Sequence, residues 1–395
     1  SKNNLLQEKV HGKIFVTGNT VIDAINQFSK ISKKYSKLDV EIDDYVLMTL
    51  HRTENVDDKQ ILSTPVVARG RIFTMDADGH IFCVSTRNGS LLWRFDPRPK
   101  EEKNGFGGGL AYSSGRIFVS TGYGEIIALR ANSGQLIWRK RLGSPFRAAP
   151  VVAEKKVFAI SLDNQLWALD GKTGQSLWNH SGISESAGLI GNASPAVAGD
   201  IVLAPYSSGE ITALRIENGR TIWSDVLGKQ GLASSGISTF NDINGSPVID
   251  RGLAFAISHG GHLVAINIRS GLRVWEQDLA GLNNPWVAGD YLYIVTTEGE
   301  VVCLIRDTGS VLWVQSLPRY ADPEDNEGMI TWSGPLLLSD RLVLTSSAGV
   351  AITLSPYDGS YLGRVVMPDS LSLPPVVANN TIFVLTDQAE LFALR

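Results

Sequence analysis

The sequence lacks several features that mark whole classes of protein. No apolar run reaches the roughly 18 residues of a membrane-spanning helix, and the N-terminus has neither a signal-peptide pattern nor a lipobox cysteine. We therefore expect a soluble chain, with any export signal already removed. No basic run occurs, and the net charge of -4 with a pI near 5.9 argues against a nucleic-acid partner.

The first 60 residues also lack what the rest of the chain has in abundance. They contain no Trp and two Gly, whereas the remaining residues contain 9 Trp and 37 Gly. They hold 8 Lys and 1 Arg, against 7 Lys and 20 Arg in the remainder. This switch predicts two segments of unrelated origin, residues 1–60 and residues 61–395.

A repeat with a period of about 44 residues runs through the long segment. A small residue is followed six positions later by Gly and, four positions after that, by Trp in most copies. The small residues are Cys83, Ala128, Ala168, Ala213, Ala265, Cys303 and Thr353, with an eighth at Ala393. The glycines are Gly89, Gly134, Gly174, Gly219, Gly271, Gly309 and Gly359, and the last positions are Trp93, Trp138, Trp178, Trp223, Trp275, Trp313 and Gly363.

Each copy has the pattern of one propeller blade. In Pro150–Trp178, short β-branched runs alternate with turn residues, and Gly174 lets the chain reverse through positive φ before the last strand. The Trp that follows is large enough to fill the gap between neighbouring blades. The repeat thus predicts an all-β fold, an eight-bladed β-propeller of four-stranded blades.

The repeat resembles that of the quinoprotein (PQQ-like) group, whose pattern "ALDxxTGxxxW" is matched by "ALDGKTGQSLW" at Ala168–Trp178. Within this group, length and blade count are similar to the BamB family of outer-membrane assembly lipoproteins. The resemblance implies that two loops, Gly188–Pro195 and Phe240–Pro247, dock onto a barrel-inserting protein.

Four loop residues carry that implied contact. Leu189 and Asp242 match the apolar and acidic residues of the family pattern. Ile190 stands where the pattern has Arg, and Asn244 stands where it has a second Asp.

A quinone-dependent oxidoreductase is the alternative for this repeat. Such enzymes need calcium-binding carboxylates, a catalytic Asp and usually adjacent cysteines, whereas Cys83 and Cys303 lie far apart and occupy the small-residue position. We expect both to be buried small hydrophobic residues. His259 and His262 have metal-like spacing but flank a hairpin turn without a third ligand, so we predict neither a metal site nor a cofactor.

The short segment resembles UDP-N-acetylglucosamine 2-epimerases. The matching stretches are "NLL" (Asn4–Leu6), "VTGNTVIDA" (Val16–Ala24) and "LHRTENVD" (Leu50–Asp57). The resemblance implies that the loop with His51, Arg52 and Glu54 faces a nucleotide sugar in the complete enzyme. Because most of that enzyme is missing, we expect no epimerase activity and treat residual UDP-sugar binding as a second alternative.

Closure of the eighth blade is open to two interpretations. Pro374–Arg395 supplies three strands and stops before the Gly-xxx-Trp strand. We expect Lys13–Thr17 and Tyr45–Leu50 to stay parallel around a helix, Thr20–Leu38, as a separate β-α-β segment, leaving blade eight with three strands. The alternative is that Tyr45–Leu50 pairs with Leu391–Leu394 and completes it.

The resemblance to the BamB family then sets the expected function. It implies a non-catalytic, monomeric scaffold that binds a protein of the outer-membrane barrel-assembly machinery. The site of action is the periplasm, with attachment to the outer membrane through a lipid anchor lost from this chain.

Overall fold

A computed structural model describes the backbone of Phe15–Thr17, Thr20–Ile22 and Tyr45–Thr49, and residues 63–76, 78–99, 107–183, 193–227 and 242–394 in full. Strands and turns account for these parts of the chain, with no helix among them, and hence none long and apolar enough to cross a membrane. The chain divides into two compact units, Pro97–Arg319 and Ser1–Asp96 with Tyr320–Arg395.

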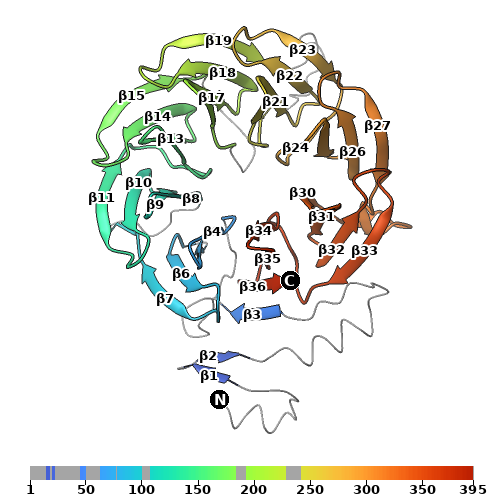
Figure 1. The fold of residues 1–395 in the computed structure, drawn as a ribbon, viewed down its shortest axis with the longest axis horizontal. Helices are drawn as coiled ribbons and strands as arrows, with labels where there is room; N and C mark the ends of the chain where they lie inside the picture. Colours follow the sequence, from blue (N-terminus) through green and yellow to red (C-terminus); the bar gives the residue numbers. More distant parts are fainter. Residues whose placement is uncertain are drawn as a thin grey trace. The chain divides into compact units, whose positions relative to one another are not determined.

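The unit Pro97–Arg319 contains five four-stranded antiparallel sheets, blades two to six (Figure 1). Blade two has β8 (Gly108–Ser113), β9 (Arg116–Thr121), β10 (Glu125–Arg130) and β11 (Leu136–Arg141). Blade three has β12 (Val151–Ala153), β13 (Lys156–Ile160), β14 (Gln165–Asp170) and β15 (Ser176–Ser181). Blade four has β16 (Ala196–Ala198), β17 (Ile201–Pro205), β18 (Glu210–Arg215) and β19 (Thr221–Val226). Blade five has β20 (Val248–Asp250), β21 (Leu253–Ile257), β22 (Leu263–Asn267) and β23 (Arg273–Gln277), and blade six has β24 (Trp286–Ala288), β25 (Tyr291–Val295), β26 (Glu300–Ile305) and β27 (Val311–Ser316).

The unit of Ser1–Asp96 with Tyr320–Arg395 holds three further blades and two hairpins. Blade one has β4 (Val66–Ala68), β5 (Arg71–Met75), β6 (Ile81–Ser85) and β7 (Leu91–Phe95). Blade seven has β30 (Trp332–Leu338), β31 (Arg341–Ser346), β32 (Val350–Leu354) and β33 (Tyr361–Val366). Blade eight has β34 (Val376–Ala378), β35 (Thr381–Leu385), β36 (Glu390–Leu394) and β3 (Tyr45–Thr49). The hairpins are β1 (Phe15–Thr17) with β2 (Thr20–Ile22) and β28 (Tyr320–Asp322) with β29 (Glu327–Met329).

The repeat pattern explains how each blade is built. In blade three, Ala168 pairs with Trp178, and the register shifts directly after Ala168, at a β-bulge. The turn before the last strand is closed by the Oδ1 atom of Asp170, which accepts hydrogen bonds from the backbone N–H groups of Lys172 (3.0 Å) and Thr173 (2.7 Å). Gly174 ends this turn at φ 75°, a conformation that favours glycine.

Neighbouring blades pack through these same positions. A Cβ atom added to Gly174 of blade three would lie 2.6 Å from Cε3 of Trp138 in blade two. The same contact recurs between Trp178 and Gly219, Trp223 and Gly271, and Trp275 and Gly309. The prediction that the repeated Trp fills the gap between blades is confirmed at these four junctions.

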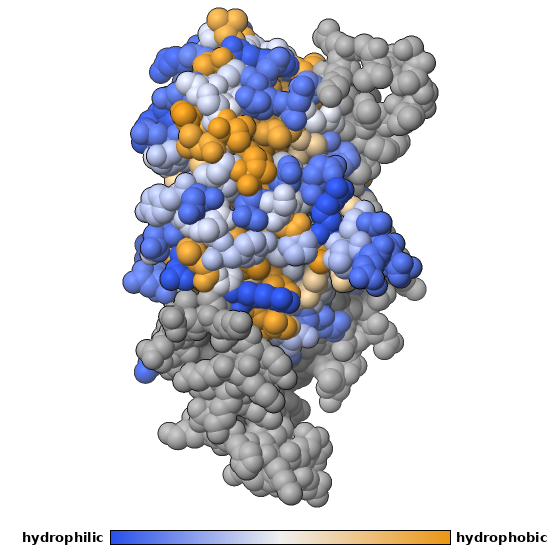
Figure 2. Space-filling view, turned by 90° about the vertical axis from the view of Figure 1, so that its right-hand side faces the viewer, coloured by the Kyte–Doolittle hydropathy of each residue, from blue (hydrophilic) through white to orange (hydrophobic). Residues whose placement is uncertain are grey.

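The core consists of clusters shared by adjacent blades. Blades four and five, for example, bury Leu203 and Ala213 together with Ala256 and Val264. The last strand of each of blades one to seven lies at an edge of its sheet and carries exposed apolar side chains, such as Leu92 and Val314, beside polar ones. Figure 2 shows the result on one face, where small apolar groups lie between polar ones.

The expectation of a three-stranded eighth blade was wrong. β3 pairs antiparallel with β36, and Val46 lies opposite Ala393 (Figure 1). An open β36 would leave a row of unpaired N–H and C=O groups, which a strand as apolar as Tyr45–Thr49 can pair. The alternative interpretation is therefore the one the structure supports.

The expectation of a separate β-α-β segment was also wrong. One reason is the pairing of β3 with β36, and the other is local. Thr20–Ile22, the start of the expected helix, forms a strand that pairs antiparallel with Phe15–Thr17. Two residues, Gly18 and Asn19, separate these β-branched runs, and Gly-Asn between such runs favours a hairpin. The rest of the expected helix, up to Leu38, lies outside the described residues.

Among the described residues, each of the eight blades has four antiparallel strands, and in every blade these are consecutive in the sequence apart from β3 in blade eight. The predicted fold class, an all-β eight-bladed propeller of four-stranded blades, is confirmed.

Candidate partner interface

The second of the two expected docking loops ends in a buried segment. Asp242 is 2% exposed and Ile243 equally so, whereas Asn244 is half-buried. Ile243 packs in the core shared by blades four and five. Leu189 and Ile190, in the first loop, lie outside the described residues, so their predicted contact stays a prediction.

Backbone contacts hold this segment to blades five and six. The carbonyl of Asp242 accepts a hydrogen bond from the N–H of His259 (3.0 Å), and the Oδ1 atom of Asn284 accepts one from the N–H of Ser246 (2.7 Å). A Cβ atom on Gly245 would lie 2.4 Å from the carbonyl oxygen of Asn283, so that only glycine permits this close approach. The segment is therefore a rigid end for the chain that precedes it.

The ends of the two loops meet. The N–H of Ser194, near the end of the first loop, donates to Oγ of Ser246, near the end of the second, at 2.9 Å. The hydroxyl of Ser194 in turn donates to the carbonyl of Ala149 (2.9 Å), and Ala193 is buried in the same cluster as Ile243. Ser194 and Ser246, one residue from each of the two expected loops, thus lie side by side. The sequence contained no signal for this bond, because Ser is common in turns.

The other end of the first loop is held by a polar cluster. The N–H of Ile183 donates to Oε2 of Glu210 (3.1 Å), and its carbonyl accepts from Nδ2 of Asn164 (2.8 Å). Nearby, Nδ1 of His180 lies 2.9 Å from the hydroxyl of Tyr206. Burial raises the pKa of Tyr206 and lowers the pKa of His180, although the charge of Glu210 opposes the second shift. Sequence reasoning did not single out this cluster.

The cysteines match their prediction. Cys83 and Cys303 are buried and free, and each pairs with the Trp of its blade. Burial raises the pKa of the Cys83 thiol to about 12 and that of Cys303 to about 11. Thiols of this kind are poor nucleophiles and metal ligands at neutral pH.

Asp76, Asp78 and His80 form the cluster of potential metal ligands in the described residues, with ligand atoms within 4.8 Å of one another. The Asp76 carboxylate is already used, because it accepts a hydrogen bond from the His80 N–H (2.8 Å) and lies 3.0 Å from His80 Nδ1. In blade two, Thr121 closes the same turn by accepting from the N–H of Glu125. We therefore assign Asp76 to turn capping.

The repeat gives His80 the same position as Glu125 and His262, where the sequence indicates a solvated start of a strand. The structure corrects this interpretation, because His80 is 4% exposed and Glu125 is 5% exposed. The residues of the epimerase-like loop, His51, Arg52 and Glu54, lie outside the described residues.

Comparison with known proteins identifies the family. The family model "Outer membrane protein assembly factor BamB" matches residues 77–315. The chain belongs to the BamB family. A second model, "UDP-N-acetylglucosamine 2-epimerase", matches residues 1–85 and so runs past residue 60 into blade one.

Curated relatives agree with the family match. The chain is 25% identical to BamB of Yersinia pestis over 245 residues (62% of this chain and 60% of the relative) and 26% identical to BamB of Escherichia coli over 212 residues (53% and 51%). It spans about half to three fifths of the length of these BamB relatives. An uncharacterised protein, RP232 of Rickettsia prowazekii, is 26% identical over 84% of this chain and 82% of its own length.

Solved structures show the same fold. BamB from Moraxella catarrhalis superposes with a TM-score of 0.74 at 20% identity, covering 89% of this chain and all of that one. A europium-containing methanol dehydrogenase superposes with a TM-score of 0.65 at 14% identity, covering 88% and 84%. At these identities the BamB-family propeller and the dehydrogenase share architecture, and the chemistry is a separate question.

Proposed function

We propose that this BamB-family propeller is a non-catalytic scaffold that binds the barrel-inserting protein of the outer-membrane barrel-assembly machinery. It would act as a monomer in the periplasm, held at the outer membrane by a lipid anchor. The observation that carries the proposal is the hydrogen bond between Ser194 and Ser246. Because a residue of each loop is bonded to a residue of the other, the two loops can form a single docking surface.

The docking residues have different roles in this proposal. In this proposal Leu189 and Ile190 supply apolar contact, and Asn244 contacts the partner, which its half-buried side chain supports. Asp242 is 2% exposed and its backbone carbonyl accepts from the N–H of His259, so in this proposal Asp242 supports the loop. The acidic contact implied by the family pattern thus becomes a positioning role at this residue.

The experiment is a titration of the purified barrel-inserting protein against the full chain by calorimetry. Leu189→Ala combined with Asn244→Ala should weaken binding by ~2–4 kcal/mol if both are hot spots. Leu272→Ala is the control and should leave the affinity unchanged, because Leu272 is 70% exposed in the turn before β23 of blade five. Equal affinities for all three proteins would refute the docking assignment.

Asp242→Asn separates support from direct contact. It keeps the shape of the side chain and removes its charge, so affinity should fall only if the loop backbone shifts. Hydrogen exchange at the His259 amide, which donates to the Asp242 carbonyl, reports such a shift. Lost affinity with an unchanged His259 amide would return Asp242 to the role of a direct acidic contact.

We also propose that the epimerase-like segment, residues 1–60, contributes a strand and not a catalytic loop. Calorimetry with UDP should show no binding, and saturable binding lost on Arg52→Ala would favour a nucleotide-sugar site instead. The coding DNA across Asp58–Ser63 would reveal whether the junction is genomic.

A further inference from the structure

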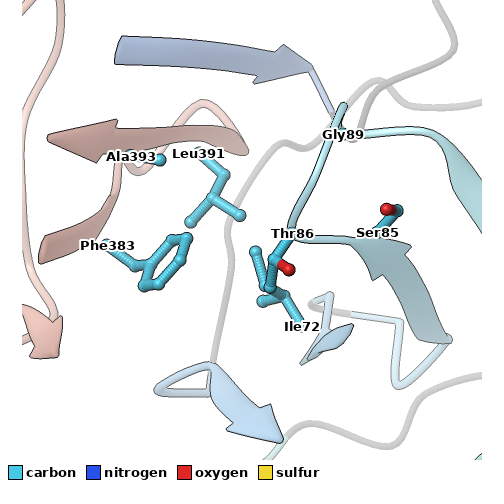
Figure 3. Close-up of a pocket in the computed structure, with 7 residues that line it drawn as sticks. All are labelled: Ile72, Ser85, Thr86, Gly89, Phe383, Leu391 and Ala393. Carbon is cyan, nitrogen blue, oxygen red and sulfur yellow. The ribbon is translucent and has the colours of Figure 1, made fainter. Parts of the chain in front are cut away.

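The repeat buries most of its apolar side chains between neighbouring blades. In Figure 3, for example, Ile72 of blade one and Phe383 and Leu391 of blade eight line one narrow gap, and each is at most 3% exposed. One end of blade three is different, because Leu162 is 37% exposed and Ile183 is 56% exposed.

No other copy of the repeat has a large apolar residue at either of these two positions. Leu162 lies in the turn before β14, and Gln165 pairs with Ser181, so this turn and Ile183 lie at the same end of blade three. The residues in the place of Leu162 are Ala77, Gly122, Ser207, His259, Thr297, Ser347 and Asp387. Those in the place of Ile183, five residues after the repeated Trp or Gly363, are Arg98, Gly143, Gly228, Ala280, Pro318 and Pro368.

The residue before Ile183 explains why this side chain is exposed. The N–H of Gly182 donates to the carbonyl of Asn164 at 2.8 Å, as the N–H of Leu227 does to the corresponding carbonyl of blade four (2.7 Å). Leu227 is fully buried, whereas a Cβ atom on Gly182 would lie 2.6 Å from Cδ2 of Tyr206. The Tyr206 ring thus fills the space beside Gly182, and the apolar residue comes one position later, in solvent.

Side chains from two blades fix the backbone of Ile183. Its N–H donates to Oε2 of Glu210 (3.1 Å), and its carbonyl accepts from Nδ2 of Asn164 (2.8 Å). Glu210 is held in turn, because its Oε1 atom accepts from the hydroxyls of Thr212 and Ser224 at 2.9 Å each. Ile is also stiff at its branched Cβ atom. An exposed side chain fixed in this way loses little conformational freedom when a partner covers it.

Asn164 departs from the repeat as well. It lies at φ 57°, where glycine is favoured, and the other copies have Gly79, Gly124, Gly209, Gly261, Gly299, Gly349 and Ala389 at this position. The Asn164 side chain instead bonds to Ile183 and, through Oδ1, accepts from the N–H of Ser207 at 3.1 Å. Residues that break the pattern of a fold are expected at functional sites, and Leu162, Asn164, Gly182 and Ile183 do so at one end of one blade.

We propose that Leu162 and Ile183 form an apolar contact site for the barrel-inserting protein, and that Asn164 and Glu210 are positioning residues for Ile183. This inference rests on the proposed function. Ile183 precedes the expected docking loop Gly188–Pro195 by five residues, at most about 18 Å of extended chain, so the site continues the surface of that loop. The partner contributes uncharged apolar side chains here, because a charge placed against Leu162 and Ile183 would lose water without gaining a bond.

The test is a calorimetric titration of the purified barrel-inserting protein against the full chain. Leu162→Ala combined with Ile183→Ala should raise Kd about tenfold or more. The matched control is Leu177→Ala, at a side chain 45% exposed on the edge strand β15 of the same blade, and it should leave Kd unchanged. Because the contact is apolar, the fold-change should be the same at about 0.05 M and about 0.5 M salt.

A double-mutant cycle tests the positioning role. Asn164→Gly installs the residue that most other blades have, which keeps the turn at φ 57° and removes both side-chain hydrogen bonds. It should raise Kd about threefold in the parent chain and have no further effect in Ile183→Ala, because it acts through Ile183. An equal rise in both backgrounds would mean that Asn164 does not position Ile183.

The remaining outcomes separate this inference from the proposed function. If the parent chain does not bind the barrel-inserting protein, both fall. If Leu189→Ala with Asn244→Ala weakens binding but Leu162→Ala with Ile183→Ala does not, the apolar site alone is overturned. A fold-change that disappears at high salt would also overturn it. Both sites are exposed, so the thermal midpoint of the Leu162 and Ile183 double variant should stay within about 2 °C of the parent value.

Discussion

The Nη1 atom of Arg306, in blade six, lies 2.6 Å from Oδ2 of Asp250, in blade five. The same guanidinium donates through Nη2 to Asp307 (2.6 Å). Its side chain is 7% exposed, so the charge is withdrawn from water and depends on these two carboxylates. The backbone carbonyl of Arg306 also accepts the indole N–H of Trp275. One residue therefore joins the two blades through both its side chain and its backbone.

Arg306→Leu should lower the free energy of unfolding by about 2 kcal/mol, because Asp250 loses its short bond to a buried guanidinium and keeps only Arg251 at 3.7 Å. Guanidinium chloride denaturation measures the loss. The control is Arg319→Leu, which breaks an exposed pair with Glu298 (2.7 Å) and should cost about 0.5 kcal/mol. Equal costs for the two variants would mean that burial of the Arg306 pair contributes nothing.

Trp275 permits the ring and the hydrogen bond to be separated. Trp275→Ala should cost ~3–5 kcal/mol of stability through the cavity left between blades five and six. Trp275→Phe keeps most of the ring and should lose about 1 kcal/mol for the hydrogen bond to Arg306, plus a smaller packing term. The control is Leu272→Ala at a site 70% exposed, with an expected change within about 0.5 kcal/mol. If Trp275→Phe costs as much as Trp275→Ala, the hydrogen bond dominates instead.

His180 should make stability depend on pH. Burial lowers its pKa in the folded chain, so below the ordinary value of about 6.5 the unfolded chain binds the proton more readily. The contribution to stability is complete above about pH 7 and is lost as the pH falls through 6.5 towards the lower folded pKa. His180→Gln should flatten this part of the curve of unfolding free energy against pH.

Tyr206→Phe is the control for that experiment. It removes the hydroxyl that lies 2.9 Å from His180 but keeps the buried ring stacked on the imidazole. Stability should fall by about 1 kcal/mol at every pH, while the slope below pH 6.5 remains. A slope that disappears with the hydroxyl would assign the pH dependence to the hydrogen bond and not to burial.

Deleting residues 1–58 should expose one edge of β36. Amide exchange in Glu390–Leu394 should become at least tenfold faster, because half of the ladder bonds of this strand depend on Tyr45–Thr49. Hydrogen exchange with mass spectrometry measures the change. Deletion of residues 1–14 is the control, since it leaves β3 intact, and exchange in β36 should stay unchanged. Identical exchange after both deletions would contradict the pairing.

The recurring parts of the fold could be predicted because the same requirement acts in each blade. Ala168 lies opposite Trp178 in blade three and Cys303 opposite Trp313 in blade six, as the spacing implied. The residue type at each of these positions is set by packing within the blade. A short stretch of sequence therefore suffices to predict it.

The partner of Tyr45–Thr49 could not be predicted on the same grounds. Its apolar and β-branched residues suit a strand both in a separate β-α-β segment and in blade eight. No neighbouring residue distinguishes these two arrangements. The choice depended on β36, far away in the sequence, whose unpaired edge offered the better set of hydrogen bonds.

The candidate interface shows a similar limit. The resemblance implied a partner contact for Asp242 because of its acidic side chain. The residue type does not reveal that Asp242 and the neighbouring Ile243 are buried, with Ile243 in the core. The bond between Ser194 and Ser246 joins loops about fifty residues apart and has no sequence signature. Burial and long-range hydrogen bonds require the packed structure.

The pairing of β3 with β36 also sets the order in which the chain can fold. β36 is the last described strand to leave the ribosome, whereas its partner is among the first, so Tyr45–Thr49 must wait through synthesis of every other blade. Blades one to seven consist of strands adjacent in sequence and can form as they emerge. Among the blades, only blade eight must wait until β36 has been synthesised, and its closure is then a late, slow event because it pairs residues far apart in the sequence.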